Sequence, residues 1–195
     1  MQILSGTASD LPRQVMAGIA CYRHKVFIDM LGWPLPVRDG MELDQFDRPD
    51  ARYVVAHDEH GTVIGTARLL PTTQPYLLGE VFPHLMGDQP VPCSDEVWEL
   101  SRFAAVDFSR ETPSAGLGQF SSPVAIELLR AAIACAKEHK VKWLITVSPL
   151  GVERLLSRAG FRARRLAPPI VIDGIPIFAC SINCHSLLNE NNEHY

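Results

Sequence analysis

The sequence predicts an α/β protein built as a three-layer α/β/α sandwich around a mixed central sheet. The first indication is the order of the predicted elements, which runs helix, loop, strands, helix, strand, helix, strands. The second is the length of 195 residues, which together with 47% hydrophobic and 21% charged residues suits one globular domain with a sizeable core. We therefore expect a single domain over residues 1–195, with a frayed tail at 186–195.

The spacing of apolar residues predicts the elements of the N-terminal half. Apolar residues recur at helical intervals from Leu11 to Met30, which predicts a helix with Asp10 as its N-cap, and the prolines of "GWPLP" end it. The stretches at 41–50 and 108–120 are expected to be loops. Strands are predicted at 53–56, 63–70 and 97–107, the first two forming a hairpin.

Two later helices are predicted by a serine followed by a proline. Ser122-Pro123 and Ser148-Pro149 each place a capping hydroxyl before a proline at the first helical position. The helices are therefore expected over about 123–139 and 149–158. "KWLITV" between them predicts a buried strand, and the last hairpin should turn at Asp173-Gly174.

Charge and composition favour some locations and partners over others. The formal charge of −4 argues against nucleic acid as a partner. No apolar run is long enough to cross a membrane, and the N-terminus lacks a signal-peptide pattern. The five cysteines contain no CxxC pair and suit reduced thiols. We expect a cytoplasmic protein with neither a nucleic-acid nor a membrane partner.

Familiar cofactor and nucleophile motifs are absent. The chain contains no GxGxxG, no Walker lysine loop, no HExxH and no serine-centred nucleophile elbow, and its seven histidines form no ligand-like group. We expect no metal and no cofactor. Covalent catalysis by Cys21 or Ser101 is not indicated but stays open.

Charged residues in apolar settings are the strongest local signal. Arg68, Glu99 and Arg102 stand inside apolar strands, and such side chains are almost never buried without partners. The acidic stretch "MELDQFDRPD" offers these partners: Glu42, Asp44 and Asp47. At this point a purely structural ion network explains the pattern as well as a catalytic site does.

Strand alternation adds a condition. Regular alternation places Glu99 and Arg102 on opposite faces of one strand. If both serve one site, the strand must carry a bulge, or the site must wrap around its edge.

Five motifs now show a family resemblance. "YRHKVFIDMLGW", "ELDQFDRPDARYVVA", "GTARLLPT", "VFPHL" and "VWELSRFAAV" resemble, in order and spacing over residues 20–160, the acyl-homoserine-lactone synthases, autoinducer synthases of LuxI type. The resemblance implies a fold similar to that of the N-acetyltransferases. It also implies synthesis of an N-acyl-L-homoserine lactone quorum-sensing signal from S-adenosylmethionine, as a substrate, and an acyl thioester, with release of methylthioadenosine.

The resemblance also implies the site residues. Its S-adenosylmethionine site is matched by Arg23, Phe27, Trp33, Asp44, Asp47, Phe82 and Arg102. Carboxylates and aromatic faces both attract a sulfonium or an ammonium, and an arginine fork suits the substrate carboxylate. The catalytic set is Glu99, Glu42, Arg68 and Arg102, with Glu99 the first choice of base and Glu42 the second.

The acyl thioester is expected beside the bulged strand. Ser101, Phe103 and Ala104 would line its carbonyl, with N–H groups near the last two as oxyanion donors. Thr146 is expected at the β-position of the acyl chain, although a β-branched residue filling a strand is an equal alternative. Residues 1–20 are a candidate mobile lid.

The acyl donor is expected to be acyl carrier protein rather than coenzyme A. Lys137, Arg154, Arg158 and Arg164 belong to a basic stretch that suits docking of an acidic carrier, although a solvated basic helix end explains each singly. Pro113 replaces the Gln or Arg that opens the coenzyme A motif of acetyltransferases, yet acyl-coenzyme A stays open as donor.

Two other functions stay open. One is an N-acyltransferase acting on a different amine, which would release no methylthioadenosine. The other is a non-catalytic sensor that binds adenosylmethionine or acyl ligands without turnover.

Overall fold

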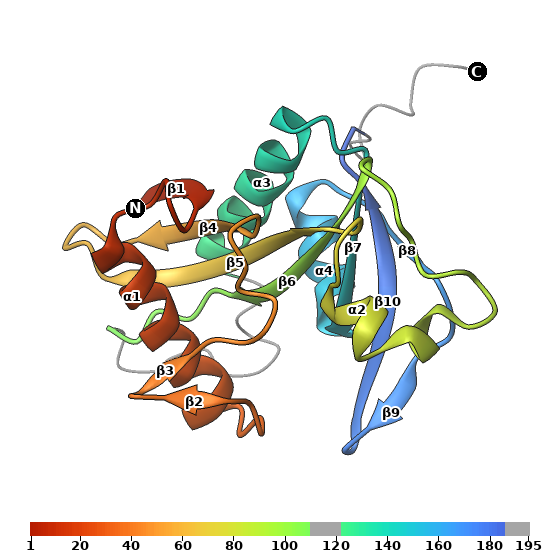
Figure 1. Cartoon of the computed structure of the whole chain (residues 1–195), viewed down its shortest axis with the longest axis horizontal. Helices are drawn as coiled ribbons and strands as arrows, with labels where there is room; N and C mark the ends of the chain where they lie inside the picture. Colours follow the sequence, from red (N-terminus) through yellow and green to blue (C-terminus); the bar gives the residue numbers. More distant parts are fainter. Residues whose placement is uncertain (110–121, 186–195) are drawn as a thin grey trace.

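The computed structural model describes residues 1–109 and 122–185 (Figure 1). The strands are β1 (Gln2–Thr7), β2 (Val37–Arg38), β3 (Met41–Glu42), β4 (Arg52–His57), β5 (Val63–Pro71), β6 (Val97–Ala104), β7 (Trp143–Pro149), β8 (Ala163–Arg165), β9 (Ile170–Ile172) and β10 (Ile175–Asn183). The helices are α1 (Arg13–Arg23), the π-helix η1 (His24–Met30), α2 (Leu77–Glu80), the 3₁₀-helix η2 (Pro83–Met86), α3 (Pro123–Glu138) and α4 (Gly151–Ala159).

The central sheet is mixed, as predicted. Its strands follow the order β1-β4-β5-β6-β7-β10-β8, with β9 attached to β10. β6 and β7 are parallel, and α3 lies in the crossover between them, whereas the other pairs of this sheet are antiparallel.

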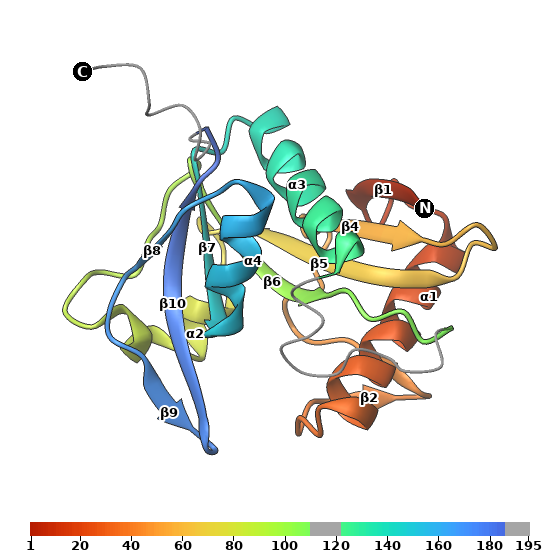
Figure 2. The same cartoon turned by 180° about the vertical axis from the view of Figure 1, so that it is seen from behind.

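Helices cover both faces of the sheet, which confirms the three layers. α1 lies over one face beside β4 and β5, and α3 and α4 lie on the opposite face (Figures 1 and 2). The buried residues of α3, among them Leu128 and Ile133, pack with Val54, Leu69 and Leu100 of the sheet. A separate cluster on the α1 side includes Ile19, Tyr53 and Leu70.

Most predicted elements are present, and their caps follow two patterns. Ser122 caps α3 as predicted, since its hydroxyl accepts a hydrogen bond from the N–H of Ala125 at 3.1 Å. Ser148-Pro149 does not start a helix: Pro149 still belongs to β7, and α4 begins at Gly151 without a side-chain cap. The strand continues because Phe178 and Ile177 of β10 pair with this serine-proline pair.

The first helix also begins later than predicted. α1 starts at Arg13 without a side-chain cap. Asp10 instead accepts hydrogen bonds from the N–H and the hydroxyl of Thr7, both at 2.9 Å, and so closes the turn after β1. The helix extends to Met30 as predicted, but its last part is the π-helix η1.

The sequence analysis missed several short elements. These are β1, the β2–β3 hairpin, α2, η2 and β8, of which all but β1 have two to four residues. The expected loop at 41–50 therefore starts with the two residues of β3. Most of the expected loop at 108–120, including Pro113, and the tail at 186–195 lie outside the described residues.

The sheet opens between β6 and β7. Their ladder contains the pairs Val97 with Trp143, Trp98 with Leu144 and Glu99 with Ile145, and the rest of β6 pairs only with β5. The sheet therefore splits beyond Glu99 into two halves (Figure 1). Among the described residues, no helix has both the length and the apolar character needed to cross a membrane.

Candidate active site

Residues from five parts of the chain meet on the α1 side of the sheet. Arg23 ends α1, Glu42 ends β3, and Asp44 and Asp47 follow in the next loop. Arg68 comes from β5 and Arg102 from β6. The structure thus brings together the three arginines and three carboxylates that the sequence analysis proposed as partners.

Arg23 joins two of the carboxylates. Its Nε donates to Glu42 Oε2 at 2.5 Å, and its two terminal nitrogens donate to both oxygens of Asp47 at 2.7 and 3.0 Å. The hydroxyl of Tyr53 donates to the same Asp47 carboxylate at 2.9 Å. Burial opposes the charge of Asp47, but the guanidiniums of Arg23 and Arg68 hold its pKa well below the ordinary range.

Arg68 and Arg102 complete the network. Arg68 donates to both oxygens of Asp44 at 2.6 and 3.2 Å. Arg102 bridges Glu42 and Asp44, with its Nη2 at 3.0 and 2.7 Å from one oxygen of each. Three guanidiniums and three carboxylates therefore balance, and Arg23, Glu42 and Arg68 are fully buried.

A bulge in β6 makes this arrangement possible. Thr66 pairs with Ala104 and Arg68 with Ser101, so that two residues of β6 stand opposite Ala67 alone. Arg102 adopts φ 50°, which is unusual for a residue with a side chain. The extra residue turns Arg102 to the face that also carries Ser101, whose hydroxyl accepts from Arg68 Nε at 3.2 Å. Of the two alternatives that strand alternation left open, the bulge is the one present.

Aromatic rings lie against one end of the network. Phe27 and Trp33 stack with centroids 5.0 Å apart, and the Arg102 guanidinium lies 5.6 Å from the Phe27 centroid. Phe27 is buried, whereas 37% of Trp33 is exposed. Phe82, the third ring predicted for this site, does not lie with Phe27. It packs against the apolar cluster that contains Leu78 and Ile145.

Glu99 has a partner that the sequence analysis missed. Its carboxylate accepts hydrogen bonds from the main-chain N–H groups of Leu77, at 3.1 Å, and Leu78, at 2.7 Å. Burial raises the pKa of Glu99 to about 7, although these N–H groups and the nearby guanidiniums of Arg68 and Arg102 oppose the shift. The sequence analysis missed this contact because it did not predict α2, whose four residues are too few for helical periodicity to show.

The predicted acyl-binding residues lie on both sides of the opening in the sheet. Ser101, Phe103 and Ala104 belong to the part of β6 that has separated from β7. Thr146 is buried in β7, and its hydroxyl lies 3.1 Å from that of Ser148, which the sequence analysis had considered only as a helix cap. Because side chains alternate along β7, these hydroxyls lie on the face opposite Ile145.

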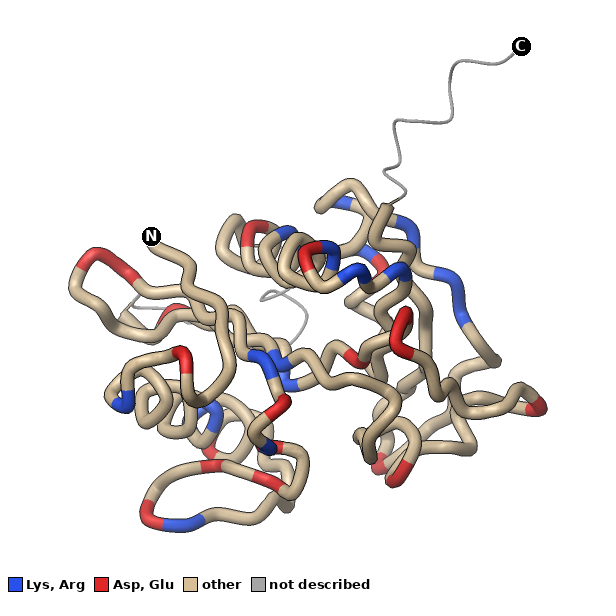
Figure 3. The backbone as a smooth tube through the Cα atoms, turned by 45° about the horizontal axis from the view of Figure 1, so that its top comes forward, with Lys and Arg blue, Asp and Glu red and all other residues tan. Residues whose placement is uncertain are grey.

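The predicted docking residues are all exposed. They are Lys137 at the end of α3, Arg154 and Arg158 on α4, and Arg164 in β8. α3 and α4 are neighbours, and Figure 3 shows Lys and Arg positions following one another along this side of the chain. The adjacent Arg165 differs, because Glu153 binds it in a bidentate pair with both contacts at 2.7 Å.

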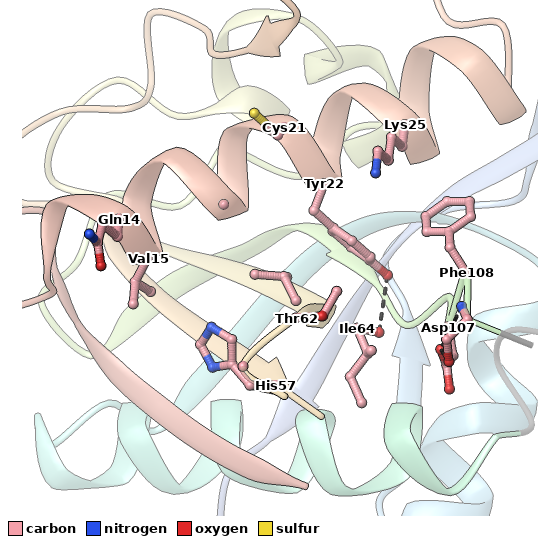
Figure 4. A pocket seen from close by; sticks show the side chains of 14 residues that line it. Gln14, Val15, Cys21, Tyr22, Lys25, His57, Thr62, Ile64, Asp107 and Phe108 are labelled. Atoms are coloured by element: carbon pink, nitrogen blue, oxygen red, sulfur yellow. Dashed lines mark hydrogen bonds between the residues drawn. The ribbon is translucent and has the colours of Figure 1, made fainter. Parts of the chain in front are cut away.

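A groove of about 410 Å³ lies elsewhere, between α1 and the β4–β5 turn (Figure 4). Cys21 and Tyr22 of α1 and Lys25 of η1 line it opposite His57 and Phe108. The Tyr22 hydroxyl lies at its floor and is 3.1 Å from the carbonyl oxygen of Ile64. None of the predicted site residues lines this groove, so we locate the site at the charged network and the split in the sheet.

The fold and this site define a class of protein. The mixed sheet, with helices on both faces and a split beyond the parallel pair β6–β7, has the fold of the acyl-CoA N-acyltransferases. A solved acyl-CoA N-acyltransferase from Pseudomonas aeruginosa has the same fold, with a TM-score of 0.60 at 15% identity over 92% of this chain and 97% of that one.

Comparison with known proteins narrows the class to one family. The autoinducer synthase family model matches residues 9–191. An acyl-homoserine-lactone synthase from Acinetobacter nosocomialis is 53% identical over 183 residues, which covers 94% of this chain and 100% of that protein. The chain therefore belongs to the autoinducer synthase family and is an enzyme of the acyltransferase type.

Two solved relatives share the fold closely. TofI, in a ternary complex with an inhibitor and MTA, has a TM-score of 0.80 at 43% identity, covering 94% of this chain and 92% of that one. BjaI, described as a CoA-dependent acyl-homoserine lactone synthase with SAM and isopentyl-CoA, has a TM-score of 0.80 at 25% identity, covering 93% and 82%.

Proposed function

We propose that this enzyme makes an N-acyl-L-homoserine lactone from S-adenosylmethionine and an acyl thioester and releases methylthioadenosine. The observation that carries the proposal is the balanced network of three arginines and three carboxylates at the β6 bulge, beside the Phe27–Trp33 stack. Relatives solved with SAM, or with MTA, support it.

S-adenosylmethionine would bind at the aromatic end of the network. Trp33, Phe27 and Arg102 are the groups at this end, and a ring face attracts the sulfonium while a guanidinium binds the carboxylate. Asp44 would hold the ammonium. Arg23, which is fully buried, and Asp47, its bidentate partner, would fix these groups in place, and Phe82 would contribute from the side of α2.

The first step is amide formation. The substrate ammonium must lose a proton before its nitrogen attacks the thioester carbon and the thiolate leaves. Glu42 is occupied by two guanidiniums, whereas Glu99 has a pKa of about 7, which suits a group that accepts a proton near neutral pH. We assign the proton to Glu99, through a water, and the oxyanion to N–H groups near Phe103 and Ala104.

The second step is lactone closure. A carboxylate oxygen attacks the γ-carbon, the bond from that carbon to sulfur breaks, and its electron pair neutralises the sulfonium as methylthioadenosine leaves. No proton moves, so the site must mainly hold the carboxylate in line with the departing sulfur. Arg102, itself fixed by Glu42 and Asp44, is placed to do this.

Acyl carrier protein is the donor we propose. The exposed Lys137, Arg154, Arg158 and Arg164 would meet its acidic surface, and the acyl chain would enter through the split between β6 and β7 toward Thr146. BjaI is described as CoA-dependent, so acyl-coenzyme A is the alternative donor. A cytoplasmic location and the absence of nucleic-acid and membrane partners stay predictions.

Purified enzyme tests the function directly. It is incubated with S-adenosylmethionine and either acyl carrier protein or coenzyme A loaded with the same acyl group, and products are followed by mass spectrometry. We expect lactone and methylthioadenosine in equal amounts, formed faster from the carrier protein. An acylated amine without methylthioadenosine would indicate another N-acyltransferase, and ligand binding without turnover would indicate a sensor.

A further inference from the structure

Helix α2 begins with a cap from a distant strand. Its N-cap residue, Tyr76, provides no side-chain hydrogen bond, and an isolated helix of four residues is not stable alone. The free N–H groups of its first two residues, Leu77 and Leu78, donate instead to the carboxylate of Glu99 in β6. The Leu78 contact is buried and the Leu77 contact is part-buried, and both are charge-assisted when the carboxylate is ionised, so they hold α2 to the sheet.

The segment that Glu99 holds covers one half of the split sheet. Leu78 of α2 and Leu85 and Met86 of η2 are buried in one cluster with Ile145 of β7 and Ala179 of β10. The N–H of Phe82 donates to the carbonyl oxygen of Leu78 at 3.2 Å, and that of Leu85 donates to Phe82 at 3.0 Å. These hydrogen bonds fix the position of η2 relative to α2.

Other hydrogen bonds hold this segment and the residues that flank it on either side. The hydroxyl of Tyr76 donates to the carbonyl oxygen of Pro92 at 2.6 Å, and that of Thr72 donates to Val97 at 2.7 Å. The Gln89 amide donates to the carbonyl oxygen of Leu166 at 2.6 Å. These contacts involve no charged group, so they offer ways to loosen the segment without changing Glu99.

Glu99 stands at the point where the sheet divides. It is the last residue of β6 that pairs with β7, opposite Ile145, and beyond it β6 turns toward the bulge at Arg102. One carboxylate therefore joins the end of the β6–β7 ladder to the segment that covers β7 and β10.

We propose that Glu99, besides accepting the proton, is a positioning residue that fixes residues 76–86 as one wall of the acyl-donor cleft. This inference rests on the proposed function, because it takes the split between β6 and β7 to be the cleft for the thioester. We call the two hydrogen bonds from Leu77 and Leu78 to Glu99 the clamp. Loss of the clamp would loosen residues 76–86 and weaken binding of the acyl donor, while binding of S-adenosylmethionine at the Phe27–Trp33 end would be unaffected.

Amide exchange of the full-length enzyme without substrates tests the clamp itself. In Glu99→Gln, one oxygen is replaced by an NH₂ group that cannot accept, so one of the Leu77 and Leu78 amides loses its partner and should exchange roughly tenfold faster, the factor that one hydrogen bond of ordinary net strength provides. Glu99→Asp, which keeps the carboxylate on a shorter stem, should restore part of the protection. Unchanged exchange at both amides in Glu99→Gln would overturn the clamp, whether or not the enzyme makes a lactone.

Steady-state kinetics tests the consequence. Tyr76→Phe loosens the segment but keeps the Glu99 carboxylate, so KM for the acyl donor should rise severalfold while KM for S-adenosylmethionine and the pH dependence of kcat stay as in the wild type. Tyr22→Phe is the matched control, because it removes one buried hydroxyl that lies outside both the segment and the charged network. An unchanged donor KM in Tyr76→Phe, or an equal rise for both substrates, would refute the positioning role. Absence of lactone from the wild type would refute the proposed function instead.

Discussion

The two faces of the central sheet are built from the same strands but hold together by different forces. On the α1 side, β5 and β6 carry Arg68, Ser101 and Arg102, and every guanidinium of the network has carboxylate partners. On the α3 side, the same strands carry Leu69 and Leu100, which pack into an apolar core. The comparison shows that alternation separates a polar site from the core, and that one bulge then adds Arg102 to the polar side.

The two faces should respond differently to the loss of one side chain. A buried ion network loses one partner and keeps the unpaired charge of the other, whereas an apolar core is left with a cavity.

Arg68→Ala should cause the largest loss of stability. It removes the bidentate partner of Asp44 and one of the two cations beside Asp47, both nearly buried, and removing one member of a buried pair costs about 3–5 kcal/mol. Urea unfolding measures the free energy. Arg165→Ala, which breaks an exposed pair with Glu153, should cost far less. Similar losses in both variants would contradict the distinction between buried and exposed pairs.

Leu128→Ala should destabilise the opposite face by a comparable or smaller amount. Leu128 is fully buried on α3, and truncation of such a residue costs about 2–5 kcal/mol. The loss should be insensitive to pH, since no ionisable group loses a partner. A pH-dependent loss would show that the two faces are coupled through the sheet.

Glu99 should make both activity and stability depend on pH. As a base Glu99 acts when it is ionised, so kcat/KM should rise with pH through about 7. In Glu99→Gln this rise should be absent. Stability should change in the other direction. Because the pKa is raised from 4.5 to about 7 by burial, the favourable contribution is complete below the lower value and is lost as pH rises through the upper one.

The effect of Glu99 on the free energy of unfolding can be measured over the pH range around its raised pKa. A shift of this size corresponds to about 3 kcal/mol between pH 5 and 8. The lowered pKa of Asp47 acts only at more acidic pH, so it does not interfere in this range. Urea unfolding of wild type and Glu99→Gln at both pH values should show a flatter dependence in the variant; parallel curves would argue against a raised pKa.

Neutralising the basic surface should have the smallest effect. With Arg154, Arg158 and Arg164 all changed to Gln, KM for acyl carrier protein should rise severalfold at low salt, and KM for S-adenosylmethionine should not change. Arg38→Gln removes an exposed charge on β2 and serves as the control. Equal effects on both substrates would place docking elsewhere.

Much of the fold could be predicted because its elements are long or strongly marked. The hairpin β4–β5, the capped helix α3 and the turn at Asp173-Gly174 follow from periodicity and local turn chemistry. The partners of Arg68 and Arg102 could also be predicted, because a buried charge must be paired and the acidic stretch offers the carboxylates. The helix start predicted at Ser148-Pro149 was wrong, because a local capping pattern cannot show that pairing with β10 extends the strand.

By itself, the sequence determined the alternation of helices and strands, the set of charges that had to meet, and the need for a bulge in the strand of Glu99 and Arg102. Each of these follows from local periodicity or from the cost of burying a charge alone. Only the tertiary structure decided which carboxylate binds which arginine, that Phe82 lies apart from Trp33, and that Glu99 caps α2. These depend on contacts between residues far apart in the chain, and no local pattern records such contacts.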